Sequence, residues 1–445
     1  MTGSAAGRLA PPVLVALVLA VFANATGGVF VFDDIADILQ NDSAKAATFV
    51  ERLAAMNRPL TKASYALQDL IHGPWAAGFH AVNVILHAAA ALLAYALVRR
   101  AFRLTGGADG AAALAALAAA ALWAVHPALT ETVTYVSGRS MGLSSVLVLA
   151  MLLAATGRQT QGARLAAFAA AFLAPLARET ALIAPAILIW WTLTLKPEGE
   201  RSGLAPALLG TALAAALIAM LPRHTDLIAH SLASRPPAEA LRGNIHAAFD
   251  ILTYWAAPWR VTIDPAPPLA WPWSDARTLA KLAFFAAAAV AAIALRRRAP
   301  LFAFAIGLAL LALAPSNTLL WRADPVSLKP LYLGGLGLVL ALAAVLPRRA
   351  FVALALTGTV ALGIATIQRN ALFADEIALW QDAAARTPDY GRPSIMLGYA
   401  LFNAGRYGEA EAALARGCDL DPLDAEAQAA LDLVRAILAA EGRKP

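Results

Sequence analysis

Eleven apolar stretches, each close to the length of a membrane-spanning helix, occupy most of this chain and restrict what it can fold into. A helix needs about 20 apolar residues to cross the hydrocarbon core of a bilayer. Of the 445 residues, 60% are hydrophobic and 14% are charged, whereas soluble domains carry about 25% charged residues. The pattern predicts an all-α integral membrane protein with a bundle of about eleven transmembrane helices. The stretches centre on residues 12–29, 79–98, 110–125, 141–155, 164–177, 180–195, 203–221, 278–295, 300–320, 330–346 and 350–367.

The first stretch follows Arg8 and resembles a signal peptide at first sight. Its length is nearer to a membrane span, and a small-residue cleavage site is only weakly present. We therefore expect it to be the first membrane helix. The high content of Ala, Gly and Pro favours a bacterial source and an inner membrane.

The basic residues fall in short clusters between apolar stretches, as in the cytoplasmic loops of membrane proteins. With a cytoplasmic N-terminus every cluster falls on the cytoplasmic side, and the C-terminus is periplasmic. The formal net charge of +6 therefore indicates loop anchors and not a nucleic-acid partner. The clusters are Arg99, Arg100 and Arg103; Arg158 and Arg164; Lys196 and Arg201; Arg296, Arg297 and Arg298; and Arg348 and Arg349.

This topology leaves four outer segments that contain nearly all the residues able to do chemistry. They are residues 30–78, 126–140, 222–277 and 321–329. In the third segment, NIHAAFDILTYWAAPW is too short and too aromatic to predict a span. Because Tyr and Trp favour the headgroup level, an interfacial helix is expected there.

A second, more polar unit begins near residue 368, so we predict a membrane domain over 1–367 and an outer helical domain over 368–445. Small residues in this unit would let two antiparallel helices pack closely, as in a tetratricopeptide repeat (TPR). The single cysteine, Cys418, excludes an internal disulfide and is expected to be a small buried residue. The residues at repeat spacing are Leu397, Gly398, Tyr407, Ala410, Leu414 and Pro422.

Several short motifs, taken in order along the chain, resemble one family. They are FDDIADILQN, NRPL, HAVNVILH, HPALTETVTYVSGR, RET and YWAAPWRVTID, followed by the C-terminal repeat. Together they are similar to the transmembrane and tetratricopeptide-repeat O-mannosyltransferases and their bacterial relatives, within the GT-C class of glycosyltransferases. The resemblance implies an active site in the outer loops and a sugar donor carried on a polyprenyl or dolichyl phosphate. Two departures are a much shorter repeat array and the stretch SLKPLYLGG, which contains Tyr332, in place of an RYLYLPS-like pattern.

Asp33 and Asp34 form an acidic pair directly after the first apolar stretch. Neighbouring carboxylates repel, so the pKa of one should be raised, as suits a general base. An inverting sugar transfer needs such a base to accept the proton of the acceptor hydroxyl. Alternatively, both aspartates only keep a helix end in water, but the resemblance favours catalysis by this pair.

A phosphate leaving group requires positive charge near it. Arg139 and Arg178 interrupt apolar sequence, where an ionisable group is costly unless it is paired or functional. Glu131 and Glu179 are their expected partners, although Arg178 and Glu179 could instead form an internal ion pair. Outer cations could bind phosphate or simply be solvated. The cation candidates are Arg58, Lys62, Arg139, Arg178, Arg322 and Lys329.

The remaining polar candidates carry weaker expectations. His80 and His87 are seven residues apart, about two helical turns, too far to chelate one metal. His126 resembles a hydrogen-bonded residue at a helix end, while the family resemblance places it, with Tyr332, near the active cavity. Asp264 precedes Pro265 and could be a turn residue or lie over the donor cavity. We expect neither a metal nor a cofactor.

The favoured function is transfer of a sugar, with mannose as one candidate, from a lipid phosphate to a protein Ser or Thr hydroxyl. The helical repeat would then hold the acceptor, because repeat surfaces commonly bind peptides. The same donor chemistry with a glycolipid or cell-envelope acceptor is an alternative, as is a non-enzymatic scaffold that presents the repeat. A transporter is disfavoured, since its charges would gather at mid-membrane and not on one side. Membrane lipids and a lipid-linked sugar are the expected partners.

Overall fold

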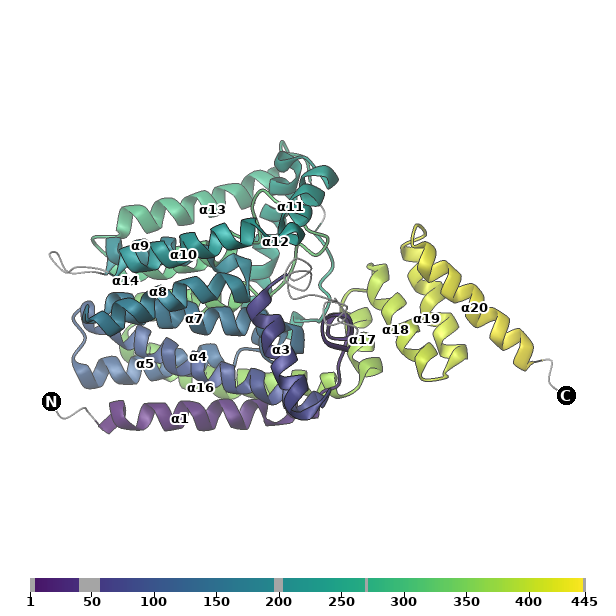
Figure 1. Ribbon diagram of the computed structural model, residues 1–445, viewed down its shortest axis with the longest axis horizontal. Coiled ribbons are helices and arrows are strands. Elements are labelled where there is room, and N and C mark those ends of the chain that lie inside the picture. Colours follow the sequence, from purple (N-terminus) through teal and green to yellow (C-terminus); the bar gives the residue numbers. More distant parts are fainter. Residues whose placement is uncertain (1–4, 40–56, 196–202, 269–270, 443–445) are drawn as a thin grey trace.

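The computed structural model describes residues 5–39, 57–195, 203–268 and 271–442, and every regular element in these ranges is helical. Figure 1 shows two bodies: a bundle of long helices aligned side by side, and a row of shorter helices at one end of that bundle. This arrangement agrees with an all-α membrane protein that carries a polar helical unit.

Each of the eleven apolar stretches forms a helix of the bundle. Five helices in the described residues are long and apolar enough to cross a membrane, or up to seven if each of two bent helix pairs is one span. Four others are shorter apolar helices, so the prediction of eleven spans stays a prediction. The helices are α1 (Ala5–Phe22), α4 (Ala76–Leu104), α5 (Asp109–Ala124), α7 (Arg139–Thr156), α8 (Gln161–Ala177), α9 (Ala184–Thr194), α10 (Leu204–Ala219), α13 (Ala276–Leu295), α14 (Pro300–Leu313), α15 (Leu331–Val345) and α16 (Arg348–Ala371).

Small residues allow these helices to pack closely. The Ala-rich helix α5 lies at the centre, in contact with α1, α4, α15 and α16, and most of its residues are buried. Gly337 of α15 faces α14, where a Cβ atom would lie 2.6 Å from the carbonyl oxygen of Ala305. By contrast, α13 on the outside exposes Leu279, Leu282 and Val290. Apolar side chains exposed in this way are favourable in contact with lipid tails.

Short helices gather at the end of the bundle where α1 finishes (Figure 1). The predicted interfacial segment forms part of α12 (Pro237–Ala256), which packs against α13 and α15. The predicted basic clusters within the described residues lie at the other end, where Arg99 at the end of α4 binds Asp109 at the start of α5. The predicted cluster of Lys196 and Arg201 lies outside the described residues. The other elements at the α1 end are α3 (Pro59–His72), α6 (Thr130–Val133) and α11 (Pro222–Ser234).

The C-terminal unit is a row of helices that pack on one another in sequence order. Gly398 lies so near α19 that a Cβ atom would be 2.5 Å from the side chain of Leu414. Ala410 and Leu414 are fully buried, and Cys418 is buried as predicted. This close packing is what the repeat pattern requires, while the identification as a TPR stays a prediction. The helices are α17 (Glu376–Arg386), α18 (Gly391–Asn403), α19 (Tyr407–Leu420) and α20 (Ala425–Glu441).

Candidate active site

The loop after α1 carries the adjacent carboxylates. Phe32 has a left-handed backbone with a φ of 51°, and a helical turn follows in which the N–H of Asp34 donates to the carbonyl of Val31 at 3.0 Å. Successive side chains of a helical turn point about 100° apart. The two carboxylates therefore face in different directions: Asp33 is exposed, whereas Asp34 is 0% exposed.

Asp34 is anchored to the loop before α7. One carboxylate oxygen accepts hydrogen bonds from the backbone N–H and the hydroxyl of Ser137, at 2.7 and 2.6 Å, and the other accepts from the N–H of Val31 at 3.3 Å. Burial raises the pKa of Asp34 to about 7, and the hydrogen bonds from Ser137 oppose that shift. The charge of Asp33 makes the smallest contribution. The expected raised pKa is therefore present, but its main cause is burial and not repulsion between the two aspartates.

Tyr135 links Asp33 to the loop before α15. The backbone N–H of Asp33 donates to the Tyr135 hydroxyl at 3.0 Å. The Nζ atom of Lys329 lies 5.2 Å from the centre of the same ring, and its charge interacts with that of Asp33. The exposed carboxylate is therefore placed beside a cation from a segment almost 300 residues away.

Glu131 holds this cation in place. Its carboxylate accepts hydrogen bonds from the Ser327 hydroxyl at 2.7 Å and the Leu328 N–H at 2.6 Å, and it lies 3.7 Å from Nζ of Lys329. Burial lowers the pKa of Lys329, and the charge of Glu131 opposes this shift. Glu131 does pair with a cation, but the partner is Lys329 and not an arginine of α7 or α8, as had been predicted.

Arg178 and Glu179 follow α8 but do not form the predicted ion pair with each other. Glu179 binds Arg58 through two hydrogen bonds, at 2.8 and 3.0 Å. Arg58 has a φ of 56° and stands just before Pro59, which begins α3; Lys62 follows one turn later. The bridge therefore joins the α8–α9 turn to α3 and not α8 to α9. This geometry leaves the Arg178 side chain to be held by other groups.

The guanidinium of Arg178 donates to the hydroxyl of Ser140 at 3.0 Å, and the side chain is 3% exposed. Its Nε has no hydrogen-bond partner among the described residues. Its charge interacts with those of Arg58 and Arg322, and with Glu131 and Glu179. A buried guanidinium among like charges is costly unless an anion compensates for it.

We call Arg58, Arg178, Arg322 and Lys329 the cation cluster. The charges of these four side chains interact with one another in the pairs Arg178–Arg58, Arg178–Arg322, Arg322–Arg58, Lys329–Arg178 and Lys329–Arg58. Glu131 and Glu179 act on both Arg178 and Arg322. Asp324 also acts on Arg322, and Asp33 acts on Lys329. Because Glu131 is engaged by Lys329 and Glu179 by Arg58, a further anion such as a phosphate would be stabilised beside the buried Arg178.

Arg139 has a different environment from the cation cluster. It is 1% exposed and donates to the side-chain oxygen of Asn83 at 2.9 Å and to the carbonyl of Phe79 at 3.0 Å. Its guanidinium also lies 4.6 Å from the centre of the Tyr65 ring. The guanidinium of Arg139 therefore donates its hydrogen bonds to groups of the protein itself. It lies at the same end of the helical bundle as Asp34. Arg139 thus joins α4 to α7 through these contacts, while its predicted role in donor binding stays a prediction.

His126 and Tyr332 are also engaged by the protein. His126 stacks on Trp255 with ring centres 3.7 Å apart and accepts a hydrogen bond from the N–H of Ala128 at 3.2 Å, as expected for a residue that caps a helix. The Tyr332 hydroxyl is hydrogen-bonded to His87 at 2.7 Å, and the side chain is fully buried. Neither residue presents a polar group to the cation cluster.

Asp264 connects the membrane bundle to the C-terminal unit. Its carboxylate accepts two hydrogen bonds from Arg392 of α18, and the same guanidinium lies 2.6 Å from the carboxylate of Asp324. Burial raises the pKa of Asp264, and the bond from Arg392 opposes this shift. Asp264, which was expected to be a turn residue or to lie over the donor cavity, therefore forms an ion pair that joins the membrane bundle to the C-terminal unit.

The C-terminal unit also contacts the loop of the two aspartates. The indole of Trp380 in α17 meets the ring of Phe32 edge-on, with centres 5.7 Å apart, and the N–H of Val29 donates to the carbonyl of Phe373 at 2.9 Å. Phe32 is the left-handed residue directly before Asp33. A non-glycine residue adopts that conformation at a cost unless its surroundings hold it, and α17 supplies those surroundings.

Sequence reasoning missed Ser137, Tyr135, Ser327 and Arg392. The first two lie within the motif HPALTETVTYVSGR, between its charged residues Glu131 and Arg139, and Ser327 lies two residues before the predicted Lys329. The sequence signal that could have indicated such residues is a hydroxyl-bearing side chain close to a charged residue that is already a site candidate. No group of three or more His, Cys, Asp or Glu side chains in the described ranges is placed to hold a metal; the absence of a metal requirement stays a prediction.

Comparison with curated proteins finds relatives that match part of the chain. It is 27% identical over 156 residues to a protein O-mannosyl-transferase of Caenorhabditis elegans, which covers 32% of this chain and 22% of that protein. It is 34% identical over 142 residues to protein O-mannosyl-transferase Tmtc2 of Drosophila melanogaster, covering 28% of this chain and 14% of the relative. For protein O-mannosyl-transferase TMTC3 of Mus musculus the identity is 32% over 158 residues, covering 32% and 16%.

The chain thus spans less than a quarter of the length of these relatives. No family model matches it, and no solved structure matches it. The similarity suggests the family that the short motifs resemble, and it points to the same class of enzyme.

Proposed function

We propose that this protein is a membrane glycosyltransferase that moves a sugar from a polyprenyl-phosphate donor to a hydroxyl of a protein acceptor. The names of the partial relatives support a transferase of sugars to proteins, and mannose is the sugar those names suggest. The long apolar helices support an integral membrane protein. The GT-C class, the lipid carrier and the inverting course belong to the proposal.

One observation carries the assignment of roles: Tyr135 contacts both the backbone of Asp33 and the side chain of Lys329. An exposed carboxylate able to accept a proton is thereby placed next to cations able to bind a phosphate. In the pair, Asp34 has no exposed surface and is fully engaged by Ser137 and Val31. We therefore assign the general base to Asp33 and a positioning role to Asp34, because a base must first be able to reach its proton.

In the proposed reaction the acceptor oxygen attacks the anomeric carbon from the side opposite the phosphate. A bond from that carbon to the acceptor oxygen forms, and the bond to the phosphate oxygen breaks. The acceptor proton passes to the carboxylate of Asp33. The electron pair of the broken bond leaves with the lipid monophosphate, whose growing negative charge is stabilised by Arg178, Arg322 and Lys329.

The proposal also orients the chain, with the N-terminus in the cytoplasm and the C-terminus in the periplasm of a bacterial inner membrane. All eleven bundle helices would then span, and the arginine clusters at the far end would face the cytoplasm. The C-terminal unit, proposed as a TPR-like domain, would present the protein acceptor to the site. A reporter fused after Pro445 tests this orientation, and activity of that reporter in the cytoplasm would contradict it.

The reaction is tested with membranes that contain the full chain and a radiolabelled polyprenyl-phosphate sugar. We expect Asp33→Asn to reduce transfer by roughly 100- to 10,000-fold, the range of general-base catalysis. Asp69→Asn removes an exposed carboxylate of α3 and is the matched control with unchanged transfer. If Asp33→Asn transfers as well as the parent chain, the base assignment is wrong. Label recovered only in lipid or glycan would show that the acceptor is not a protein, and no transfer by the parent chain would indicate a scaffold.

A further inference from the structure

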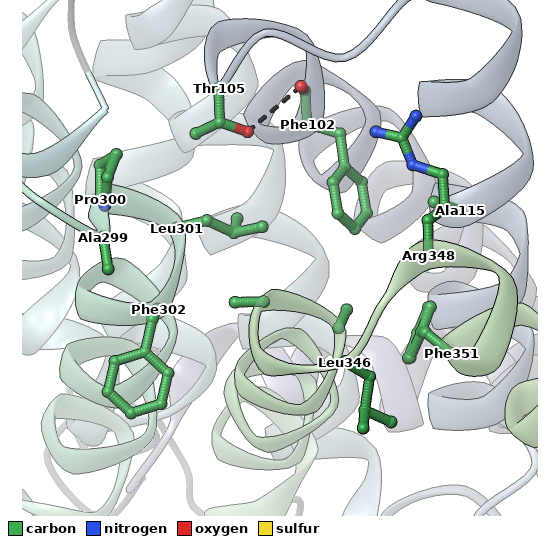
Figure 2. A pocket seen from close by; sticks show the side chains of 12 residues that line it. Phe102, Thr105, Ala115, Ala299, Pro300, Leu301, Phe302, Leu346, Arg348 and Phe351 are labelled. Carbon is green, nitrogen blue, oxygen red and sulfur yellow. Dashed lines mark hydrogen bonds between the residues drawn. The ribbon is translucent and has the colours of Figure 1, made fainter.

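A cavity of about 350 Å³ lies at the end of the bundle opposite Asp33 (Figure 2). It is bounded by the last turn of α4, the first turn of α14, the end of α15 and the first turn of α16. Its volume is at the lower end of the range of small-molecule sites, roughly 300–1,000 Å³. Phe102 in the cavity lining is 19 residues along α4 from Asn83, which donates to the carbonyl of Tyr135, so the helix separates the cavity from the carboxylate end by about 29 Å. The cavity is therefore not part of the proposed active site.

The lining of this cavity is apolar apart from one cation and the hydroxyl of Thr105, which donates to the carbonyls of Ala101 and Phe102 within α4. Its larger side chains are Phe102, Leu301, Phe302, Leu346 and Phe351, and Arg348 stands at its edge. Arg348 is exposed, and its guanidinium reaches towards the α4–α5 turn, where a Cβ atom added to Gly107 would lie 3.2 Å away. A cavity of this kind suits a ligand with an apolar body and an anionic end.

Two features reinforce the positive potential at the edge of the cavity. The helices α14 and α16 both begin there, and neither has a side-chain cap on its first N–H groups. Helix N-termini carry partial positive charge and favour anions. The nearby carboxylate of Asp109 is already bound by Arg99 at 2.9 Å and lies 3.5 Å from Arg103. The charge of Arg348 is consequently available for an external anion.

We propose that this cavity is a binding site for an anionic phospholipid. One acyl chain occupies the apolar interior, and the headgroup phosphate lies against Arg348 and the N-termini of α14 and α16. A lipid is favoured over a free phosphate because five large apolar side chains line the cavity, and burial of an apolar chain supplies binding energy that a small ion lacks. The site is independent of the proposed sugar transfer.

The test uses the full chain in detergent, with bound lipid counted by native mass spectrometry during titration with dioleoylphosphatidylglycerol. Dioleoylphosphatidylcholine has the same chains and no net charge, and we expect it to bind at least about fivefold more weakly. Arg348→Gln should weaken phosphatidylglycerol binding by about fivefold, the effect of one basic residue at an anionic surface. Arg349→Gln is the matched control, because this exposed neighbour does not line the cavity.

A second variant tests the apolar part of the site. Ala344→Phe fills the cavity from α15 and should weaken binding of both lipids, while Arg348→Gln should affect only the anionic one. Glycerol 1-phosphate, which lacks acyl chains, should not compete. Equal losses in Arg348→Gln and Arg349→Gln, unchanged binding in Ala344→Phe, or competition by glycerol 1-phosphate would each overturn the proposal.

Discussion

The two ends of the helical bundle differ in how deeply their charged side chains are buried and in how far away in the sequence their partners lie. At the carboxylate end, Asp34 is buried and the pair of Arg58 and Glu179 is half-buried, and in both cases the partners are far apart in the sequence, as with Asp34 and Ser137. At the arginine end, charges are more exposed and their partners are local, as with Arg103 and Asp109, whose side chains are 53% and 44% exposed. Buried charge is costly, so its concentration at one end indicates a built site, whereas exposed arginines at the other need only water and lipid headgroups.

This contrast also separates residues that look alike in the sequence. Arg139 and Arg178 both interrupt apolar segments, and both are almost fully buried. Arg139 is surrounded by neutral acceptors and an aromatic ring, so its contacts are complete. Arg178 has one neutral acceptor, its Nε has no partner among the described residues, and the carboxylates of Glu179 and Glu131 near it are bound by other cations. The first arrangement stabilises a fold, and the second suits a phosphate ligand.

The largest expected effect compares the two arginines at opposite ends of α8. Arg178→Gln removes a charge from the cation cluster but keeps a donor towards Ser140. We expect transfer from the lipid-phosphate sugar to fall by roughly 100- to 1,000-fold, as when a group that stabilises developing negative charge is removed. Arg164→Gln changes an exposed arginine near the start of the same helix and should leave transfer unchanged. Equal activity in both variants would contradict a role of the cluster in catalysis.

The next effect concerns stability. Arg139→Met leaves the side-chain oxygen of Asn83 and the carbonyl of Phe79 without their charged donor, which should lower the free energy of unfolding by roughly 3 kcal/mol. Thermal unfolding in detergent measures this as a lower Tm. Arg103→Gln, at the far end of the neighbouring helix α4, removes an exposed charge and should leave Tm nearly unchanged. A stable Arg139→Met protein that loses transfer would instead favour the donor-binding role predicted from the sequence.

Much of the fold could be predicted from the sequence because apolar length is a local signal. Each of the eleven stretches contains a helix, although α1 ends at Phe22 and α14 at Leu313, seven residues before their apolar stretches end, and α16 continues beyond residue 367 to Ala371. The buried Cys418 and the close contact at Gly398 also follow from local patterns of small residues. In these cases neighbouring positions in one helix carry the information.

The site could be predicted only in part, because its pairings join distant segments. The charged residues indicated which loops form the candidate site. No local sequence pattern, however, shows that Glu131 forms an ion pair with Lys329 or that Glu179 forms one with Arg58. The contact of Arg392 with Asp264 crosses 128 residues. The cause of the Asp34 pKa shift is likewise tertiary, since burial depends on the loop that covers the carboxylate.

A smaller effect tests how the C-terminal unit is attached to the carboxylate end. Arg392→Gln would leave the buried carboxylate of Asp264 without its charged partner and should weaken docking by roughly 2 kcal/mol. Hydrogen exchange of the backbone in α17 and α18 should then become faster. Arg406→Gln breaks an exposed pair with Glu409 inside the same unit and is the control. Unchanged exchange in Arg392→Gln would show that the packing of Trp380 on Phe32 is sufficient for docking.

The smallest effect is a pH dependence that belongs to Asp34. Its pKa in the folded protein, about 7, lies above the ordinary carboxyl value of 3.8, so the folded state binds more protons than the unfolded state between those values. Stability should therefore fall as pH rises through this window, by roughly 1 kcal/mol between pH 6 and 8. Asp34→Asn keeps an oxygen for Ser137 and has no titrating group, so its Tm should vary less over that range than the Tm of the parent chain. Because the exposed arginines at the opposite end do not titrate there, Arg103→Gln should retain the full slope. Parallel Tm curves for the parent chain and Asp34→Asn would mean that Asp34 is ionised throughout, and its burial would then be offset by the donors of Ser137 and Val31.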